Sequence, residues 1–104
     1  MEQNNKANTT FRFIIVPEFI LSDLSLFPVE KLLFGDIVSL SYGKGYCWAT
    51  NENLGKRYGV SDRTITRWVN RLVGKKLLIR ELHYAENSRT IQKRRIKVNT
   101  NRPD

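Results

Sequence analysis

One stretch constrains the fold of this chain more than any other: LGKRYGVSDRTITRWVNRL, at residues 54–72. Gly59 separates two segments of helical periodicity, and glycine is favoured where the backbone turns left-handed just past a helix end. Ser61 and the acid that follows it are suited to start the second segment, as a cap and as a partner of the helix dipole. The stretch therefore predicts two short helices, at 51–58 and 62–74, joined by a tight turn.

Apolar residues of this stretch fall where two such helices would meet at a steep angle. They are Leu54, Tyr58, Val60, Ile65 and Trp68. Gly55 is small at the point where the second helix must approach closely. On a wheel of ~100° per residue, the second helix has one apolar stripe. Its members are Ile65, Trp68, Val69 and Leu72. We expect this stripe to be buried and the opposite face to be exposed.

The exposed face carries side chains of the types that read DNA. Arg pairs bidentately with a guanine edge, Asn pairs with adenine, and Thr contacts a phosphate or a thymine methyl group. A solvated helix face would interleave acids with bases, but no acid follows Asp62 on this helix. We therefore favour a recognition helix over a solvated face. The candidate contacts are Arg63, Thr64, Thr66, Arg67, Asn70 and Arg71.

The candidates differ in the role expected of each. Arg63 and Arg67 point away from the apolar stripe and are the expected readers of bases. Arg71 lies on the flank of that face, where a phosphate contact is expected. Ser61 and Thr64 chiefly cap the helix start and contact phosphate only secondarily.

The N-terminal part of the chain predicts an arm and a longer helix. Residues 11–17, FRFIIVP, are expected to form a short strand or an extended arm, followed by a short helical turn. Apolar residues at spacings of three and four predict a helix that begins after Ser25 as N-cap and continues to about Ser41. They are Val29, Leu32, Leu33, Ile37 and Leu40. Gly35 inside this helix permits close packing.

A turn and a short extended segment join this helix to the next one. Gly43 and Gly45 end the first helix, and residues 46–49 are expected to be extended. Cys47 in this segment has the size and polarity of a small buried residue. Thr50 is suited to cap the helix that follows.

The C-terminal part predicts a β-hairpin with a basic surface. Apolar and alternating patterns indicate strands at 77–84 and 90–99, with turn-forming residues at 85–89 between them. The hairpin and the end of the preceding helix hold candidate backbone contacts: Arg89, Lys93, Arg94, Arg95, Lys97, Lys75 and Lys76. Such residues would contact the sugar-phosphate backbone and add affinity with little sequence information. The alternative is that charges on an edge strand only prevent sheet-to-sheet aggregation.

Charge is distributed unevenly along the chain. The formal net charge is +8, from 18 Lys and Arg against 10 Asp and Glu. Residues 1–50 hold four basic and five acidic side chains, whereas the remainder holds fourteen basic and five acidic ones. This segregation indicates a polyanionic partner for the C-terminal half, which we expect to be double-stranded DNA.

Several classes of function are not expected. The chain has one cysteine and one histidine, His83, so neither a disulfide nor a metal site nor a cofactor is predicted. Paired carboxylates, or a nucleophile with its base, cannot be assembled, so an enzyme is not expected. No apolar run has the length of a membrane span and no secretory signal is recognisable, so we expect no membrane contact and a cytoplasmic protein. Most aromatic residues are expected in the core rather than as platforms for base stacking.

The order of elements is that of a winged helix-turn-helix, an α+β but mainly α fold with three main helices and a C-terminal β-hairpin wing. We expect one domain at 11–99, with a flexible tail at 1–10 and a second tail at 100–104. The arrangement resembles the winged helix-turn-helix domains at the N-termini of phage and plasmid replication proteins, such as replisome organisers and DnaD-like primosome proteins. The matching segments are FIIVPEFIL, FPVEKLLFGDIVSLS, GKGYCWAT and NENLGKRYGVSDRTITRWVNRLVGKKLLI.

The resemblance implies binding of a replication origin, with a helicase or its loader among the partners. It extends from about Phe13 to Val98, although Trp68 is bulkier than the residue such domains often have there. A transcriptional regulator of the same fold is an alternative. Another is a protein-interaction module that forms a homodimer or higher oligomer through its aromatic N-terminal arm.

Overall fold

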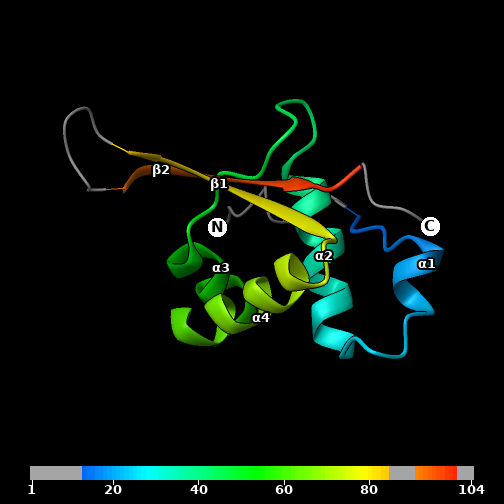
Figure 1. The fold of residues 1–104 in the computed structure, drawn as a ribbon. Helices are drawn as coiled ribbons and strands as arrows, with labels where there is room; N and C mark the ends of the chain where they lie inside the picture. Colours follow the sequence, from blue (N-terminus) through cyan, green and yellow to red (C-terminus); the bar gives the residue numbers. More distant parts are fainter. Residues whose placement is uncertain (1–12, 85–90, 101–104) are drawn as a thin grey trace, which may run out of the picture.

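The chain folds as helices followed by a two-stranded antiparallel hairpin (Figure 1). The computed structural model describes residues 13–84 and 91–100, with the side chains of 91–93 excepted. Within this part the elements are α1 (Glu18–Leu21), α2 (Pro28–Leu40), α3 (Asn51–Tyr58), α4 (Asp62–Gly74), β1 (Leu78–Tyr84) and β2 (Ile91–Val98). The mainly helical architecture with its hairpin confirms the predicted winged helix-turn-helix. The expected tail at 1–10 and the hairpin turn at 85–89 lie outside the described residues.

Side-chain caps explain why α3 and α4 begin where they do. The Thr50 hydroxyl accepts a hydrogen bond from the backbone N–H of Asn53 at 3.0 Å. In the same way, the Ser61 hydroxyl accepts from the backbone N–H of Thr64 at 3.2 Å. Each cap satisfies a donor that the first helical turn leaves unpaired. Both helices have the predicted bounds.

Helix α2 begins later than predicted. Its N-cap is Phe27 rather than Ser25, because the backbone N–H and hydroxyl of Ser25 both bond to the carboxylate of Asp23, at 2.9 and 2.6 Å. These bonds hold Ser25 in a local turn that competes with a helix start. Pro28 occupies the first helical position, where its missing N–H costs nothing. The carboxylate of Glu30 then accepts from the backbone N–H of Phe27 at 2.9 Å.

The buried face of α2 differs from the predicted apolar stripe. Leu33, Phe34 and Ile37 are in the core, but Leu32 is 44% exposed, while Val29 and Leu40 are half-buried. Two acids, Glu30 and Asp36, are almost fully buried in place of apolar residues. Hydrophobic periodicity could not predict the burial of these acids, because it depends on cations and a phenol that lie on other helices.

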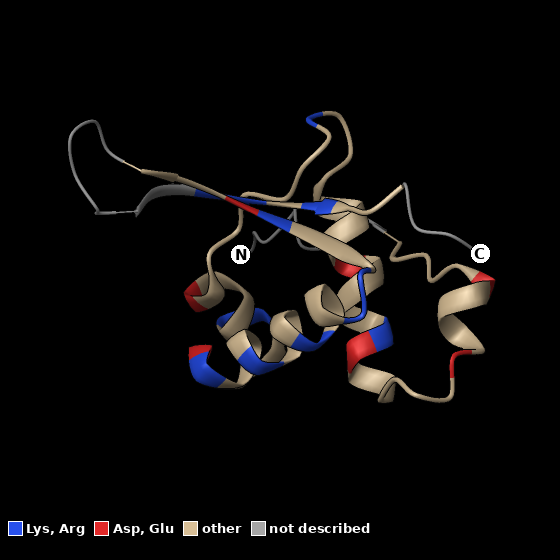
Figure 2. Cartoon of the chain, viewed as in Figure 1, with Lys and Arg blue, Asp and Glu red and all other residues tan. Residues whose placement is uncertain are grey.

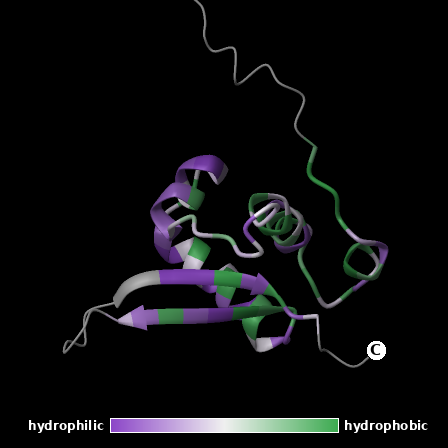
Figure 3. Ribbon diagram, turned by 90° about the horizontal axis from the view of Figure 1, so that it is seen from above, coloured by the Kyte–Doolittle hydropathy of each residue, from purple (hydrophilic) through white to green (hydrophobic). Residues whose placement is uncertain are grey.

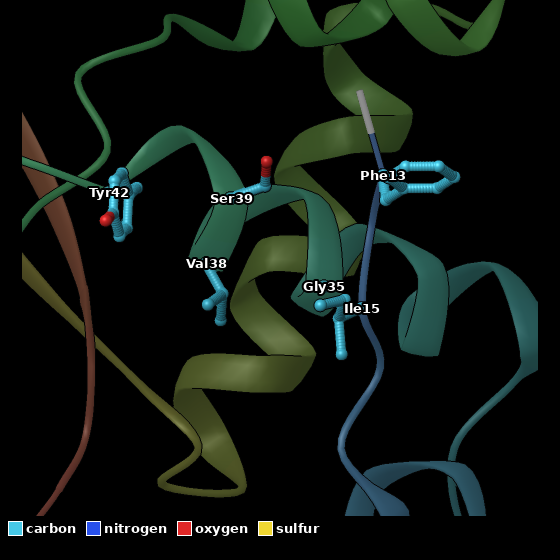
Figure 4. A pocket seen from close by; sticks show the side chains of 6 residues that line it. All are labelled: Phe13, Ile15, Gly35, Val38, Ser39 and Tyr42. Atoms are coloured by element: carbon cyan, nitrogen blue, oxygen red, sulfur yellow. The ribbon is translucent and has the colours of Figure 1, made fainter. Parts of the chain in front are cut away.

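The arm at residues 13–17 runs extended along α2 and forms no strand, so the extended-arm alternative is the observed one. It passes so close to Gly35 that a β-carbon there would lie 2.9 Å from Cγ2 of Ile14 and 2.9 Å from the carbonyl oxygen of Ile15. The expected close packing at Gly35 is therefore confirmed. Beside this contact lies a groove (Figure 4) lined by Phe13, Ile15, Gly35, Val38, Ser39 and Tyr42.

The hairpin is joined to the segment between α2 and α3. Strands β1 and β2 pair from Leu78 opposite Val98 to Tyr84 opposite Ile91. Cys47 forms a β-bridge with Ile96: each backbone N–H donates to the other residue's carbonyl, at 2.7 and 3.0 Å. Both strands carry hydrophobic and hydrophilic residues in turn (Figure 3), so one face of the hairpin packs on the helices and the other faces solvent.

Most aromatic side chains lie outside the core, which corrects the sequence-based expectation. Phe34 is buried at 1% exposure. Those exposed by about half or more are Phe13, Phe19, Phe27, Tyr42, Trp48 and Tyr84. In residues 46–49 the strand alternation explains the result, since Cys47 and Ala49 face inward and Trp48 must then face outward.

Cys47 is fully buried, and this burial raises the pKa of its thiol. Because the reactive thiolate is disfavoured and the sulfur is inaccessible, we expect the native protein to resist alkylation by iodoacetamide at neutral pH. The same reagent should modify the thiol fully once urea unfolds the chain, as followed by mass spectrometry. Equal rates in native and unfolded protein would contradict the burial of Cys47.

Candidate nucleic-acid interface

The turn between α3 and α4 fixes the relative direction of the two helices. Gly59 ends α3 in a left-handed conformation with φ of 71°, as expected for the residue past a helix C-terminus. Leu54 of α3 and Ile65 of α4 are both fully buried, and the rings of Tyr58 and Trp68 meet edge to face with centroids 6.1 Å apart. Trp68 is thus half-buried within the helix–helix contact. The arrangement is a helix-turn-helix with α4 in the position of a recognition helix.

Gly55 is required by this turn. A β-carbon there would lie 2.6 Å from the carbonyl oxygen of Val60, which is backbone and cannot move aside as a side chain would. We expect Gly55→Ala to destabilise the protein by about 2 kcal/mol, in the range of overpacked sites, measured by urea unfolding. Gly74→Ala is the control, because no atom lies within 4 Å of a β-carbon at that position. Equal stability of the two variants would contradict the close approach at Gly55.

Arg63 and Arg67 form the exposed, uncommitted part of α4. Both side chains are exposed, and neither makes a hydrogen bond or ion pair with any described residue. Basic residues follow the edge of α4 that lies farthest from the hairpin (Figure 2). Ile65, Val69 and Leu72 are fully buried on the opposite side, as the helical wheel predicted. The two guanidinium groups are therefore available to an external acceptor.

Thr66 lies on the same exposed surface but its hydroxyl has two partners. It donates to the carbonyl oxygen of Asp62 at 2.9 Å and accepts from the amide of Asn51 at 2.8 Å. Asn51 in turn accepts from the guanidinium of Arg94 at 2.6 Å. No sequence pattern indicated that Asn51 would contact both Thr66 and Arg94. As the first residue of α3, Asn51 lies between Thr66 of α4 and Arg94 of β2 and bonds to both.

The flank of α4 nearest the hairpin pairs Asn70 with a residue that the sequence analysis did not select. Arg80 on β1 is exposed and donates from Nη1 to Oδ1 of Asn70 at 2.6 Å. This bond orients the amide of Asn70 and places a further cation beside the recognition helix. Strand alternation could have indicated Arg80, since it lies two residues from the buried Leu78.

Arg71 has a different surrounding from the one predicted. Its guanidinium forms an ion pair with the buried carboxylate of Glu30, donates to the carbonyl oxygen of Ser25 at 3.1 Å and lies 5.0 Å from the ring centroid of Phe27. The hydrogen bond to Glu30 raises the pKa of Arg71. Since Nε and Nη2 are engaged in these contacts, Arg71 joins α4 to α2 and has fewer donors left for a phosphate than Arg63 or Arg67.

Four other predicted contact residues lie at the two ends of α4; the side chains of three form contacts within the fold, and the fourth side chain is exposed. Ser61 and Thr64 face each other at the start of α4, with their hydroxyl oxygens 3.1 Å apart. At the other end Lys75 donates to the hydroxyl of Ser25 at 3.1 Å, and Lys76 is exposed with a positive φ of 63°. Both ends of α4 thus add polar groups to its exposed side.

The predicted basic strand is split over two faces of the hairpin. Arg94 reaches toward α3 and donates to the carbonyl oxygen of Ala49 at 2.8 Å, and its burial lowers its pKa. Arg95 instead lies over the ring of Tyr46, and Lys97 donates to Glu81 at 2.9 Å and lowers the pKa of that carboxyl. The predicted contacts Arg89 and Lys93 lie outside the described side chains. The strand therefore does not present its described cations to one partner.

A buried polar cluster sets the position of α3 on α2. The carboxylate of Asp36 accepts from Nη2 and Nε of Arg57, at 2.7 and 3.1 Å, and from the hydroxyl of Tyr58 at 3.0 Å. Burial raises the pKa of Tyr58, so its phenol remains a donor over the physiological range. The charge of the buried carboxylate is thus compensated by hydrogen bonds that join α3 to α2.

Within the described residues no helix is both long and apolar enough to span a bilayer. A family model described as a helix-turn-helix domain matches residues 25–78, which include α2, α3 and α4. Searches among curated proteins and among solved structures gave no significant match. The matched segment is slightly more than half of the chain and contains the turn and the recognition helix described above. The chain belongs to this family of helix-turn-helix domains.

Proposed function

We propose that this chain is a sequence-specific, double-stranded DNA-binding domain that inserts α4 in the major groove. The observation that carries the proposal is the pair Arg63 and Arg67 on the second helix of a helix-turn-helix, both exposed and without a partner among the described residues. Unlike these two, several cations at α4 and on the described hairpin already contact a polar group or an aromatic ring of the fold: Arg71, Lys75, Arg80, Arg94, Arg95 and Lys97. The two arginines are thus the groups best suited to form new bidentate bonds.

The spacing of Arg63 and Arg67 supports contact with two base pairs of one site. Residues four apart lie on one helix face about 6 Å from each other along the axis, close to two base-pair steps. Arg63 and Arg67 could therefore each meet one guanine edge. Arg80 and Asn70, joined by their hydrogen bond, would contact the flanking strand.

Electrostatics gives a first test of this proposal. Six phosphate contacts would give a slope of roughly −5 for log affinity against log salt concentration. The slope is measured by fluorescence anisotropy with a labelled duplex at a series of potassium chloride concentrations. Binding that does not weaken with salt would contradict recognition through a basic surface.

A more specific function follows from the resemblance to replication proteins. We propose that the duplex is an origin of phage or plasmid replication, and that a helicase or its loader is recruited there. Selection of bound sites from a random duplex pool tests this proposal. Tandem repeats would support origin binding, whereas a palindrome would favour a dimeric transcriptional regulator.

A second candidate function is self-association through the groove between the arm and α2. Phe13 and Ile15 are each 74% exposed and Tyr42 is 92% exposed, which is unusual for apolar groups on one side of a small domain. The same surface carries both exposed aromatic rings and the groove above Gly35. In a two-fold dimer, the rings of each copy could therefore enter the groove of the other copy. Sedimentation analysis of Phe13→Ser against native protein tests it: an unchanged association state would exclude this groove.

A further inference from the structure

A second basic surface lies away from the recognition helix. The loop after α2 stands on the far side of the hairpin from α4 (Figure 1). There it borders a pocket of 320 Å³, within the range of about 300–1,000 Å³ usual for small-ligand sites. Its described lining contains no acid: Lys44, Tyr46, Trp48, Ala49, Thr50, Arg94 and Arg95.

Each of the two aromatic rings in this pocket lies beside a cation. The ammonium of Lys44 lies 5.9 Å from the ring centroid of Trp48, and Cζ of Arg95 lies 4.4 Å from that of Tyr46. Trp48 remains 57% exposed in spite of these neighbours. This large, flat ring thus lies at the surface beside a cation and outside the hydrophobic core.

The nearest acid on the hairpin is already engaged. Glu81 is opposite Arg95 in the strand register, but its carboxylate accepts from Lys97 at 2.9 Å. Arg95 is therefore left against the ring of Tyr46, and Lys44 stands on a turn between two glycines. Both cations can accept an anion without breaking an ion pair with a carboxylate.

These features match an unpaired nucleotide better than other anions. A base offers a flat face to stack on Trp48, while its phosphates offer charge to Lys44 and Arg95. Paired bases in a duplex keep their faces covered by their neighbours, and an acidic peptide has no flat group to use the ring. The chemistry therefore favours a single strand.

We propose that this pocket binds single-stranded DNA, with one base stacked on Trp48 and the adjoining phosphates held by Lys44 and Arg95. The site goes beyond the proposed duplex contact and does not depend on it, because the two use different residues on different faces. A domain with both surfaces could bind a duplex through α4 and hold a strand that has been opened nearby.

Anisotropy of a short labelled oligothymidylate tests the proposal, since this strand cannot pair with itself. We expect Trp48→Ala to weaken its binding about tenfold, as for the loss of one stacked base, and Trp48→Phe to retain most of the affinity. Lys44→Ala with Arg95→Ala should weaken binding and flatten the salt dependence by roughly 1.4 in slope, for two lost phosphate contacts. Tyr84→Ala is the matched control, because Tyr84 is an exposed aromatic residue outside this pocket.

Other probes separate the sources of affinity. An abasic oligomer of the same length should bind about tenfold more weakly, because it has phosphates but no base. Arg63→Ala with Arg67→Ala should abolish duplex binding and leave oligothymidylate binding intact. The proposal is overturned if Trp48→Ala binds like the native protein while retaining its circular dichroism spectrum. It is also overturned if thymidine monophosphate or polyglutamate competes as strongly as the oligomer.

Discussion

Arg67→Ala should weaken binding of a selected duplex by about ten- to a hundredfold, as expected for loss of one bidentate arginine–guanine contact. The side chain is exposed on α4 and has no partner among the described residues, so its removal leaves the fold intact. Specificity should also relax at one position of the DNA site, because the preference for guanine over other bases is lost together with the arginine contact. Anisotropy titrations on duplexes varied base by base measure both effects.

The control for Arg67→Ala is Lys56→Ala. Lys56 is an exposed cation on α3 that faces Glu52 at 3.7 Å, so the variant removes the same charge from a neighbouring helix. We expect only a small and sequence-independent change in its affinity. If both variants lose affinity equally across all duplexes, then Arg67 contributes charge alone and does not read a base.

Arg71→Ala should destabilise the protein by about 3 kcal/mol. Glu30 is fully buried, and without Arg71 its carboxylate would form no ion pair with any residue that the structure describes. Removal of one partner from a buried pair is strongly unfavourable, and we expect the low end of the range because the Arg71 side chain is 38% exposed. Urea unfolding followed by circular dichroism measures this loss.

A second variant separates this structural role from a phosphate contact. The double change Glu30→Gln with Arg71→Met removes the ion pair together with both charges, so much of the lost stability should return. The salt dependence of DNA binding should be the same as in native protein. A stable Arg71→Ala variant whose salt slope falls by about 0.9 would instead assign Arg71 to a phosphate.

Local rules predicted the helix-turn-helix because its signals are confined to neighbouring residues. Thr50 and Ser61 cap their helices through hydroxyls that bond three residues ahead, and Gly59 takes the left-handed conformation that the turn requires. Such contacts depend on sequence separation rather than on the fold. The bounds of α3 and the start of α4 could therefore be predicted, and the end of α4 approximately.

The ion pairs between helices could not be predicted, because their partners are far apart in the sequence. Arg71 and Asp36 have partners 41 and 21 residues away, in Glu30 and Arg57, and no spacing rule joins them. The wheel correctly separated Arg71 from Arg63 and Arg67, but it could not identify what lay on the flank. Which cations of a basic helix remain available to DNA thus depends on acids elsewhere in the fold.

The burial of the aromatic residues could not be predicted either, for a different reason. Trp48 and Tyr42 belong to hydrophobic segments, and periodicity placed residues of this kind inside. A domain of this size has one small core, which α2, α4 and the hairpin fill mainly with aliphatic side chains. Several rings therefore remain on the surface, where two of them contact cations.

Nuclear magnetic resonance of the isotope-labelled protein tests the central claim most directly. A duplex recovered by site selection is added, and backbone amides are followed together with the Nε–Hε groups of arginine. We predict that the largest shifts lie in residues 61–70 and include the side-chain signals of Arg63 and Arg67. Shifts confined to residues 13–16 and the groove beside α2, with Arg63 and Arg67 unmoved, would contradict recognition of DNA by α4.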